Sequence, residues 1–184
     1  MNTAENMTAT LKVKDGDIFK IAGIEFIKFP DKDGITPVVA KDILFRSEFG
    51  DTNDLRASDV LKRLKEEILP KICAAIGEDN VCAFPTDLTA LDGLKPYVVM
   101  EDKISLPTMD FYRENVAVFD KHPVDSWWWL ATPETAPPHG SANWILCVSP
   151  RGIINYGNFY YGDYVVGVRP ILIFKSSIFG SSEE

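Results

Sequence analysis

One segment of this chain, residues 58–77, carries a sustained helical period. Apolar residues recur there at helical spacing, and the positions between them are charged. Ser58 is a good N-cap, and Asp59 stands in the first turn, where the helix dipole favours negative charge. Pro70 lies inside the pattern and predicts that the helix kinks or ends there, and Gly77 ends the segment. The expected core-facing stripe is Leu61, Leu64, Ile68 and Ile72.

The rest of the 184-residue chain therefore has to fold from shorter elements. Its 12 prolines, 12 glycines and 11% aromatic residues favour turns and strands over a helical bundle. Residues 12–29 alternate around Ala22-Gly23 and predict two short strands. A strong turn at residues 30–34 and a third strand within residues 35–44 complete a β-meander.

The C-terminal half predicts a second short helix and then short strands. The helix begins after Thr108, its N-cap, and reaches about Asn115, whereas the remaining connections are expected to be loops. From Trp127 onward, a tryptophan run and a proline-rich loop lead into three glycine-punctuated apolar runs, at residues 144–149, 153–156 and 165–174. The sequence thus predicts an α+β fold, with one domain over residues 11–175 and flexible ends at residues 1–10 and 176–184.

Charge and cysteine content exclude several classes of partner. The chain has 19 basic and 27 acidic residues, a net charge of -8, whereas nucleic-acid binding needs clustered lysine and arginine, so we exclude that partner. Cys73, Cys82 and Cys147 are odd in number and lack zinc-site spacing, so no metal, cofactor or disulfide framework is indicated. No segment has the length of a membrane span or the pattern of a leader. We therefore expect no membrane insertion and a location in the cytoplasm or in a phage particle.

Two motifs resemble the signature of a bacterial and phage family of unknown function, which reads W-W-L-R-S-P and then G-V-R-P-A-L. They are Trp127-Trp128-Trp129-Leu130-Ala131-Thr132-Pro133 and Gly167-Val168-Arg169-Pro170-Ile171-Leu172. A strand around Val148 with Gly152 after it lies between the two. The opening hairpin, the helix at 58–68 and the segment 102–108 extend the resemblance over nearly the whole chain.

The resemblance implies a C-type-lectin-like fold, with an N-terminal β-meander, one main helix, a second short helix and a loop-rich C-terminal half with short strands. This fold is related in outline to formylglycine-generating enzymes and to the variable receptor-binding proteins of phages and diversity-generating retroelements. One departure matters, because Ala131 stands where the family usually carries arginine. Arg151 and Arg169 are the candidates to take over the role of that guanidinium.

The segment 155–164 has the composition of a ligand-binding loop. Tyrosine offers a large rigid contact area, and asparagine and glycine offer adaptable hydrogen bonds. In the related variable proteins, the same stretch before the final strand contacts ligand. The candidate ligand-binding residues are Trp144, Arg151, Asn155, Tyr156, Asn158, Tyr160, Tyr161 and Tyr164. The alternative is a β-hairpin whose tyrosines cover the edge of the core.

Trp127, Trp129 and Arg169 are interpreted as structural residues. Alternation along one strand would place Trp127 and Trp129 in the core and Trp128 on the other face, although the indoles could also form a platform for sugars or cations. The five donors of Arg169 are expected to tie loop carbonyls to the last strand. The alternative for Arg169 is bidentate binding of an anion.

These features predict a non-enzymatic recognition module of bacterial or phage origin that binds a cell-surface glycan or a protein ligand through C-terminal aromatic loops. His122 and His139 have no spacing that would join a nucleophile to a base, and we expect them on the surface or in loops. Two alternatives stay open. An enzyme of the formylglycine-generating type would use Cys147 as its reactive thiol, and a structural subunit of a phage-like assembly would bury its aromatics in a homo-oligomer.

Overall fold

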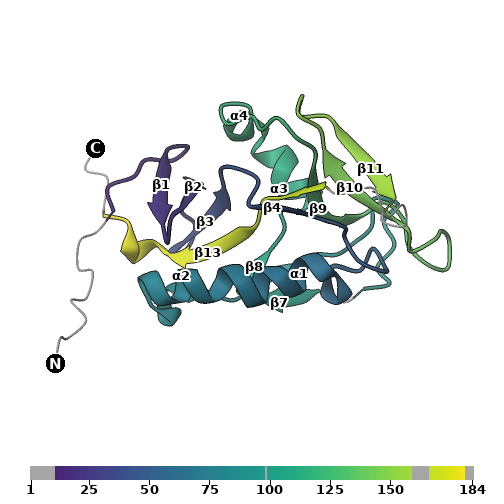
Figure 1. The fold of residues 1–184 in the computed structure, drawn as a ribbon, viewed down its shortest axis with the longest axis horizontal. Helices are drawn as coiled ribbons and strands as arrows, with labels where there is room; N and C mark the ends of the chain where they lie inside the picture. The colour runs from purple at the N-terminus through teal and green to yellow at the C-terminus, as the bar shows by residue number, and fades with distance from the viewer. Residues whose placement is uncertain (1–10, 98, 159–165, 181–184) are drawn as a thin grey trace.

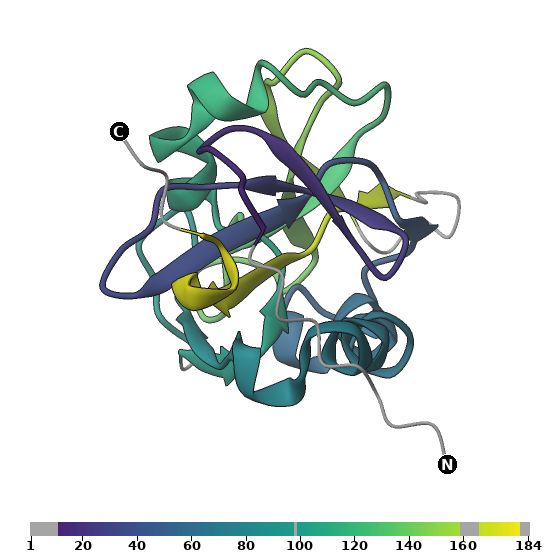
Figure 2. The same ribbon diagram turned by 90° about the vertical axis from the view of Figure 1, so that its left-hand side faces the viewer.

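The structure, a computed structural model, describes residues 11–97, 99–158 and 166–180 and has a mixed α+β fold built on two main sheets (Figures 1 and 2). Short 3₁₀ turns lie at Leu55–Ala57, Glu78–Asn80 and Ser176–Ile178. In chain order, the strands and longer helices are β1 (Ile18–Ile21), β2 (Ile24–Lys28), β3 (Ile35–Ala40), β4 (Phe45–Ser47), α1 (Asp59–Arg63), a π-helical segment (Leu64–Ile68), α2 (Leu69–Ile76), β5 (Val81–Cys82), β6 (Phe84–Thr86), β7 (Met100–Asp102), β8 (Ile104–Ser105), α3 (Met109–Glu114), α4 (Val116–Phe119), β9 (Trp128–Pro133), β10 (Trp144–Val148), β11 (Ile154–Asn158), β12 (Val166–Val168) and β13 (Ile171–Lys175).

The first sheet begins with the β-meander that the sequence predicts. Strands β1, β2 and β3 are antiparallel neighbours, and β13 pairs with β3 on one side and with β5 and β8 on the other. Ala22 and Gly23 join β1 to β2 with φ values of 50° and 80°. A two-residue turn with both φ values positive matches the twist of the strands that it joins.

The second sheet has the order β11-β10-β9-β12-β4, and β12 is parallel to β9. The chain passes between the two sheets four times, and two of these crossings, from β3 to β4 and from β12 to β13, are direct and lie side by side. Backbone hydrogen bonds hold these two crossings together, because Ala40 N donates to Pro170 O and Leu44 N donates to Val168 O, both at 3.0 Å. Arg169 therefore lies at the junction of the two sheets.

The main helix begins at the predicted N-cap, where Ser58 Oγ accepts a hydrogen bond from Leu61 N at 3.0 Å. The helix does not end at Pro70, which corrects one of the two outcomes that the sequence predicts. Leu69 N donates to Leu64 O across the π-helical segment, so the hydrogen-bond ladder is reset just before the proline. Pro70 then stands in the first turn of α2, where a missing N–H costs little. Gly77, with a φ of 86°, ends the helix as expected.

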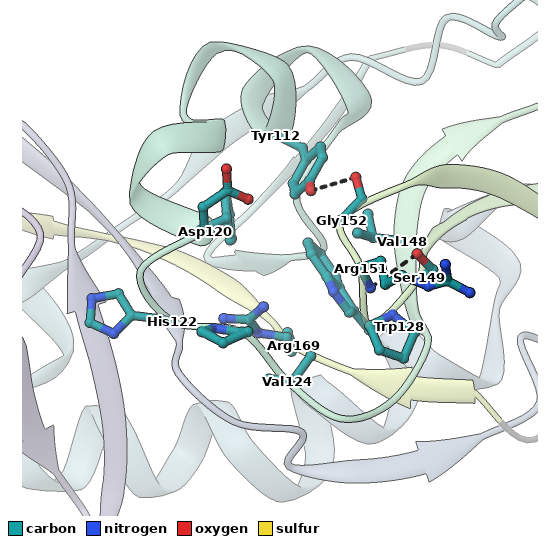
Figure 3. A pocket seen from close by; sticks show the side chains of 13 residues that line it. Tyr112, Asp120, His122, Val124, Trp128, Val148, Ser149, Arg151, Gly152 and Arg169 are labelled. Atoms are coloured by element: carbon teal, nitrogen blue, oxygen red, sulfur yellow. Dashed lines mark hydrogen bonds between the residues drawn. The ribbon is translucent and has the colours of Figure 1, made fainter.

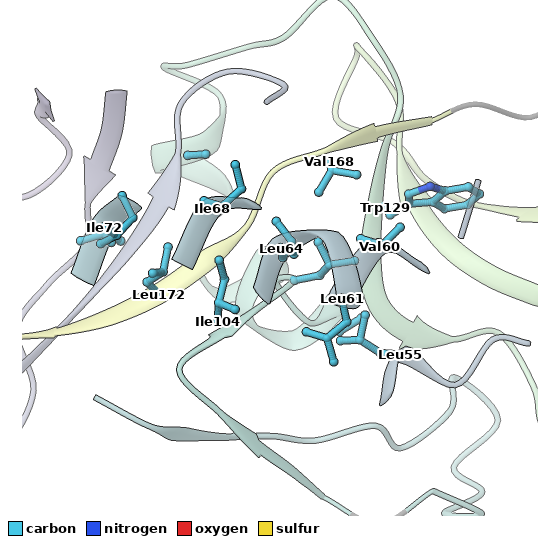
Figure 4. Packing of buried hydrophobic residues seen from close by; sticks show 14 of the residues in the cluster. Leu55, Val60, Leu61, Leu64, Ile68, Ile72, Ile104, Trp129, Val168 and Leu172 are labelled. Carbon is cyan, nitrogen blue, oxygen red and sulfur yellow. The ribbon is translucent and has the colours of Figure 1, made fainter. Parts of the chain in front are cut away.

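The sheets lie between two helical layers, with α1 and α2 on one side and α3 and α4 on the other (Figures 1 and 2). The predicted stripe of the main helix packs into the larger apolar cluster (Figure 4). A second cluster lies on the opposite face, beneath α3 and α4. In Figure 4, the stripe faces Ile104, Trp129, Val168 and Leu172.

Two buried faces explain the tryptophan run. Trp128 and Trp129 are both buried, Trp129 in the larger cluster and Trp128 in the second one. Trp127 is 39% exposed, so its expected place in the core is wrong. Side chains alternate between the two faces of the sheet only from Trp128 onward, because Trp128 is the first residue of β9. The face opposite Trp129 is not open to solvent, because α3 and α4 cover it.

Several short elements occupy regions that the sequence leaves as loops. Strands β5, β6, β7 and β8 span only two or three residues each, which is too short for an alternating pattern to register. The short helix α4 follows α3, whose N-cap Thr108 and approximate end agree with the prediction.

The C-terminal segment is packed over residues 176–180, so the flexible end predicted for residues 176–184 is wrong there. Leu11 N donates to Ile178 O at 3.0 Å, and Phe179 is only 6% exposed. The Phe179 ring meets Phe19 edge-on at 5.1 Å, which gives the segment an apolar anchor. The predicted flexible ends at residues 1–10 and 181–184 lie outside the described residues.

Candidate functional site

The hairpin of β10 and β11 forms one edge of the second sheet and carries several of the predicted ligand-binding residues. Tyr156 is 52% exposed, and its ring meets the half-buried Trp144 edge-on at 5.2 Å. Asn155 is exposed beside it, and Ile153 at the hairpin turn is 58% exposed. The hairpin therefore presents apolar and aromatic surface to solvent.

The predicted loop at residues 155–164 begins as a strand, because β11 extends to Asn158. Asn158 pairs with Trp144 in the backbone register. Tyr160, Tyr161 and Tyr164 lie outside the described residues. Of the two interpretations of this segment, the hairpin holds for the part of it that is described, and Tyr156 on that hairpin still faces solvent.

Arg151 lies exposed in the tight turn that joins β10 to β11. Ser149 Oγ organises this turn by accepting hydrogen bonds from Arg151 N at 3.3 Å and from Ile153 N at 3.0 Å. On the side of α3, Tyr112 Oη donates to Gly152 O at 2.9 Å (Figure 3). Burial raises the pKa of Tyr112, which keeps the hydroxyl protonated and donating at neutral pH.

A cavity of about 220 Å³ lies where this turn meets α3, α4 and the junction of the sheets (Figure 3). Its walls come from five separate parts of the chain. Polar and apolar groups contribute about equally to the wall, and Tyr112, Asp120, His122, Arg151 and Arg169 supply the titratable groups. The lining residues are Tyr112, Phe119, Asp120, His122, Pro123, Val124, Trp128, Val148, Ser149, Pro150, Arg151, Gly152 and Arg169.

Arg169 is the most buried charged residue at this cavity, with 1% of its surface exposed. Its Nε donates to Ala40 O at 3.0 Å, and its guanidinium carbon lies 4.9 Å from the centre of the Trp128 ring and 5.4 Å from that of Phe119. These contacts fit the structural role that the sequence predicts. They leave Nη2 buried without a hydrogen-bond partner, so the expected set of ties to loop carbonyls is incomplete.

No carboxylate in the described part of the chain forms an ion pair with Arg169. Asp42 acts on it only at longer range, and Asp42 is itself paired with Lys41 at 3.6 Å. Burial lowers the pKa of Arg169 to about 10, which still leaves the guanidinium protonated at neutral pH. The cavity thus contains a buried positive charge that the fold does not neutralise.

The residues considered for catalysis are poorly placed for it. Cys147 is 2% exposed, and burial raises its pKa to about 12, which opposes formation of a thiolate. His122 uses Nε2 to donate to Gly16 O at 2.7 Å, and His139 is exposed. All three cysteines are free, and the described residues contain no cluster of His, Cys, Asp and Glu suited to a metal ion.

Sequence reasoning missed the cavity, although two of the site residues that it predicted line it, as do Trp128 and His122, for which it also considered a functional role. Arg151 and Arg169 both line the cavity, the first as a predicted ligand-binding residue and the second as a predicted structural one. Trp144 and Tyr156 lie further along the hairpin and are not part of the lining. A lone arginine within an apolar run, as in Gly167-Val168-Arg169, is the sequence signal that points to a buried charge.

Comparisons with protein-family models, with curated proteins and with solved structures found no match to this chain. Among the helices of the described residues, none combines the length and the apolar character that a membrane crossing needs. The hairpin and the cavity are two features of the described residues that can contact a ligand.

Proposed function

We propose that this protein is a non-enzymatic recognition domain that binds a cell-surface glycan or a protein ligand through the β10–β11 hairpin. The observation that carries the proposal is an aromatic pair on a sheet edge, formed by the exposed Tyr156 and the half-buried Trp144. Aromatic rings on a rigid hairpin supply contact area at low entropic cost, and such rings dominate the binding energy of many interfaces. Arg151 adds a polar group at the turn of the same hairpin. Asn155 is next to Tyr156 in β11 and therefore points to the opposite face of the sheet, where it is exposed as well.

The environment of the reactive groups supports binding over catalysis. A buried thiol with a raised pKa is a poor nucleophile, and Cys147 lies within β10 with its side chain in the larger apolar cluster. The Nε2 atom of His122 is occupied by the carbonyl of Gly16. We therefore prefer the recognition module to an enzyme of the formylglycine-generating type.

A C-type-lectin-like fold and a phage or prophage setting belong to the same proposal. The β-meander, the main helix, the second short helix and the short C-terminal strands are the features that support it. The motif with Trp127 to Pro133 and the motif with Gly167 to Leu172 are the sequence basis for the bacterial or phage origin.

The test compares the wild type with Trp144→Ala, Tyr156→Ala and Arg151→Ala on a glycan panel and on immobilised bacterial surface proteins. The matched control is Leu91→Ala, because Leu91 is also exposed, at 51%, and lies outside the hairpin. Circular dichroism first establishes that each variant folds. We expect Tyr156→Ala to weaken binding by about tenfold or more, the size of effect that truncation of an aromatic anchor produces, while Leu91→Ala binds as the wild type does.

The proposal fails if the folded wild type binds no probe or if the hairpin variants and Leu91→Ala bind equally. Light scattering over a range of protein concentrations separates the remaining alternative. A concentration-dependent dimer or higher oligomer that Tyr156→Ala disrupts would favour the structural subunit, since assembly would then bury the same surface.

A further inference from the structure

The guanidinium of Arg169 has the features of a binding group that lacks its ligand. Its Nε donates to Ala40 O, and its guanidinium carbon lies near the rings of Trp128 and Phe119. Nη2 is buried and has no hydrogen-bond partner. In the described part of the chain, no other buried side-chain nitrogen or oxygen lacks a hydrogen-bond partner. Buried donors of a charged group are almost always paired, so the missing partner calls for an explanation outside the fold.

The cavity supplies the space for such a partner. Arg169 forms part of its wall, together with the apolar side chains of Trp128, Val124 and Val148 (Figure 3). At about 220 Å³, the cavity is smaller than the sites of drug-sized ligands, which typically occupy ~300–1,000 Å³. It suits a small group with one charged end and an apolar or ring-shaped body. Because Nη2 itself is covered, a lining side chain has to shift when the charged end reaches it.

The charges around the cavity select the kind of anion. Arg151 and Arg169 are cationic, Asp120 is anionic, and Tyr112 and His122 are the other titratable groups of the lining. This balance leaves an excess of one positive charge, which a carboxylate neutralises. A phosphate group carries about -1.5 to -2 at neutral pH and would exceed that balance beside Asp120. The flat fork of a guanidinium also matches the two oxygens of a carboxylate.

We propose that the cavity is a binding site for the carboxylate group of a small organic acid or of an acidic sugar, with Arg169 as the buried anion-binding residue and Arg151 at the rim. This site goes beyond the proposed function, because it depends on the cavity and on Nη2, which lacks a partner, rather than on the aromatic pair of Trp144 and Tyr156.

The experiment uses the full ¹⁵N-labelled chain and follows the Nε–H signals of its arginines during titration. The probes are sodium acetate, sodium glucuronate and sodium phosphate, with sodium chloride at matched ionic strength and neutral glucose as controls. Arg56 and Arg63 serve as internal references, because each already pairs with a carboxylate, Asp54 or Glu67. We expect a saturable shift of the Arg169 signal with a carboxylate, no such shift with chloride or glucose, and unchanged reference signals.

Two variants locate the site and protect the test against a folding failure. Arg169→Met removes the charge, and Val124→Phe fills the cavity while leaving Arg169 in place. We expect each folded variant to lose affinity for acetate or glucuronate by about tenfold or more, measured by signal shifts or by ligand-induced thermal stabilisation. A response to acetate identifies a small acid as sufficient, whereas a response to glucuronate alone identifies the acidic sugar.

Three results would overturn the proposal. The first is no saturable response to either carboxylate at concentrations up to about 0.1 M, where even a weak site would fill. The second is phosphate binding that is about tenfold tighter than that of both carboxylates. The third is undiminished binding by Val124→Phe. If no carboxylate binds while the hairpin variants still lose their glycan or protein ligand, the proposed function stands without the carboxylate site. If a carboxylate binds while the hairpin variants bind their ligand as the wild type does, the carboxylate site stands and the proposed function is removed.

Discussion

Gly167→Ala tests the packing that holds Arg169 at the junction of the sheets. A Cβ at Gly167 would lie 2.5 Å from Ile43 Cδ1 and 2.8 Å from Trp127 O. The Ile43 side chain is half-buried and can rotate, but Trp127 O is backbone and accepts the hydrogen bond from Gly167 N at 2.8 Å. Relief of the second contact therefore has to separate β12 from β9.

The expected cost follows from these contacts. Overpacking typically costs ~1–3 kcal/mol, and with a backbone atom in contact we expect a net loss of about 2 kcal/mol in the free energy of unfolding. For a chain of this size, each kcal/mol lowers Tm by roughly 2–4 °C, so Tm should fall by about 4–8 °C. Urea unfolding followed by tryptophan fluorescence, with calorimetry as a second probe, measures both quantities.

A matched control separates contact from backbone strain. Gly23 has a φ of 80° and open space around it, so Gly23→Ala reports left-handed strain alone, about 1 kcal/mol. Gly167 lies in a strand, where alanine is ordinarily preferred over glycine by ~0.5–1 kcal/mol. A Gly167→Ala variant as stable as the wild type, or more stable, would therefore refute the close approach of β12 to β9.

Two further predictions concern single titratable groups. Burial raises the pKa of Cys147 from the ordinary 9.0 to about 12, so native Cys147 should react with iodoacetamide at pH 7 roughly a thousandfold more slowly than a free thiol. It should become reactive only when the protein unfolds. Rapid alkylation of the native protein would reopen the enzyme interpretation. Burial alone would raise the pKa of Asp31, but hydrogen bonds from Thr36 and Lys28 outweigh it and lower the pKa below the ordinary value of 3.8. The ionised Asp31 therefore stabilises the fold above pH 3.8, and this stabilisation is lost as the pH falls through the lowered pKa. Asp31→Asn should accordingly reduce stability by up to about 1 kcal/mol at pH 7, given the exposure of Asp31, and the difference should vanish in acid, as urea titrations at several pH values would show; a difference that is constant with pH would contradict this linkage.

The fold was predictable where a pattern is long and uninterrupted. Ser58, the apolar stripe and Gly77 define the main helix because capping and helical periodicity agree with the packing. Strands of two or three residues, such as β5 and β8, carry no local signal, because the neighbour β13 positions them rather than their own sequence. Phe179 shows the same limit, since only its partner Phe19, far away in the chain, makes it an anchor.

The candidate site was predictable only in part. Composition pointed to a tyrosine-bearing surface in this segment, but Tyr156 is exposed on an edge strand rather than in the glycine-rich loop that the sequence predicts. The cavity does not follow from composition, since Tyr112, Val124, Val148 and Arg169 meet through tertiary packing alone. Even the burial of Arg169 could not show that one of its nitrogens lacks a partner, because that depends on the position of each neighbouring carbonyl.

Arg169→Met asks whether the fold itself requires the charge. The lowering of the Arg169 pKa from 12.5 to about 10 corresponds to roughly 3 kcal/mol that disfavours the charged form, at about 1.4 kcal/mol per unit. Against this, the charged hydrogen bond to Ala40 O contributes about 1.5–3 kcal/mol and the contacts with Trp128 and Phe119 about 0.5–2 kcal/mol each. Methionine keeps much of the ring contact without the charge, so the lost hydrogen bond and the relieved burial of the charge partly offset each other, and the variant should unfold within about 2 kcal/mol of the wild type. A loss of more than about 3 kcal/mol in urea unfolding would return Arg169 to a purely structural role, because the fold would then depend on the guanidinium. A near-neutral result would mean that a buried charge persists without benefit to stability, which is the condition expected of a group retained for binding an anion.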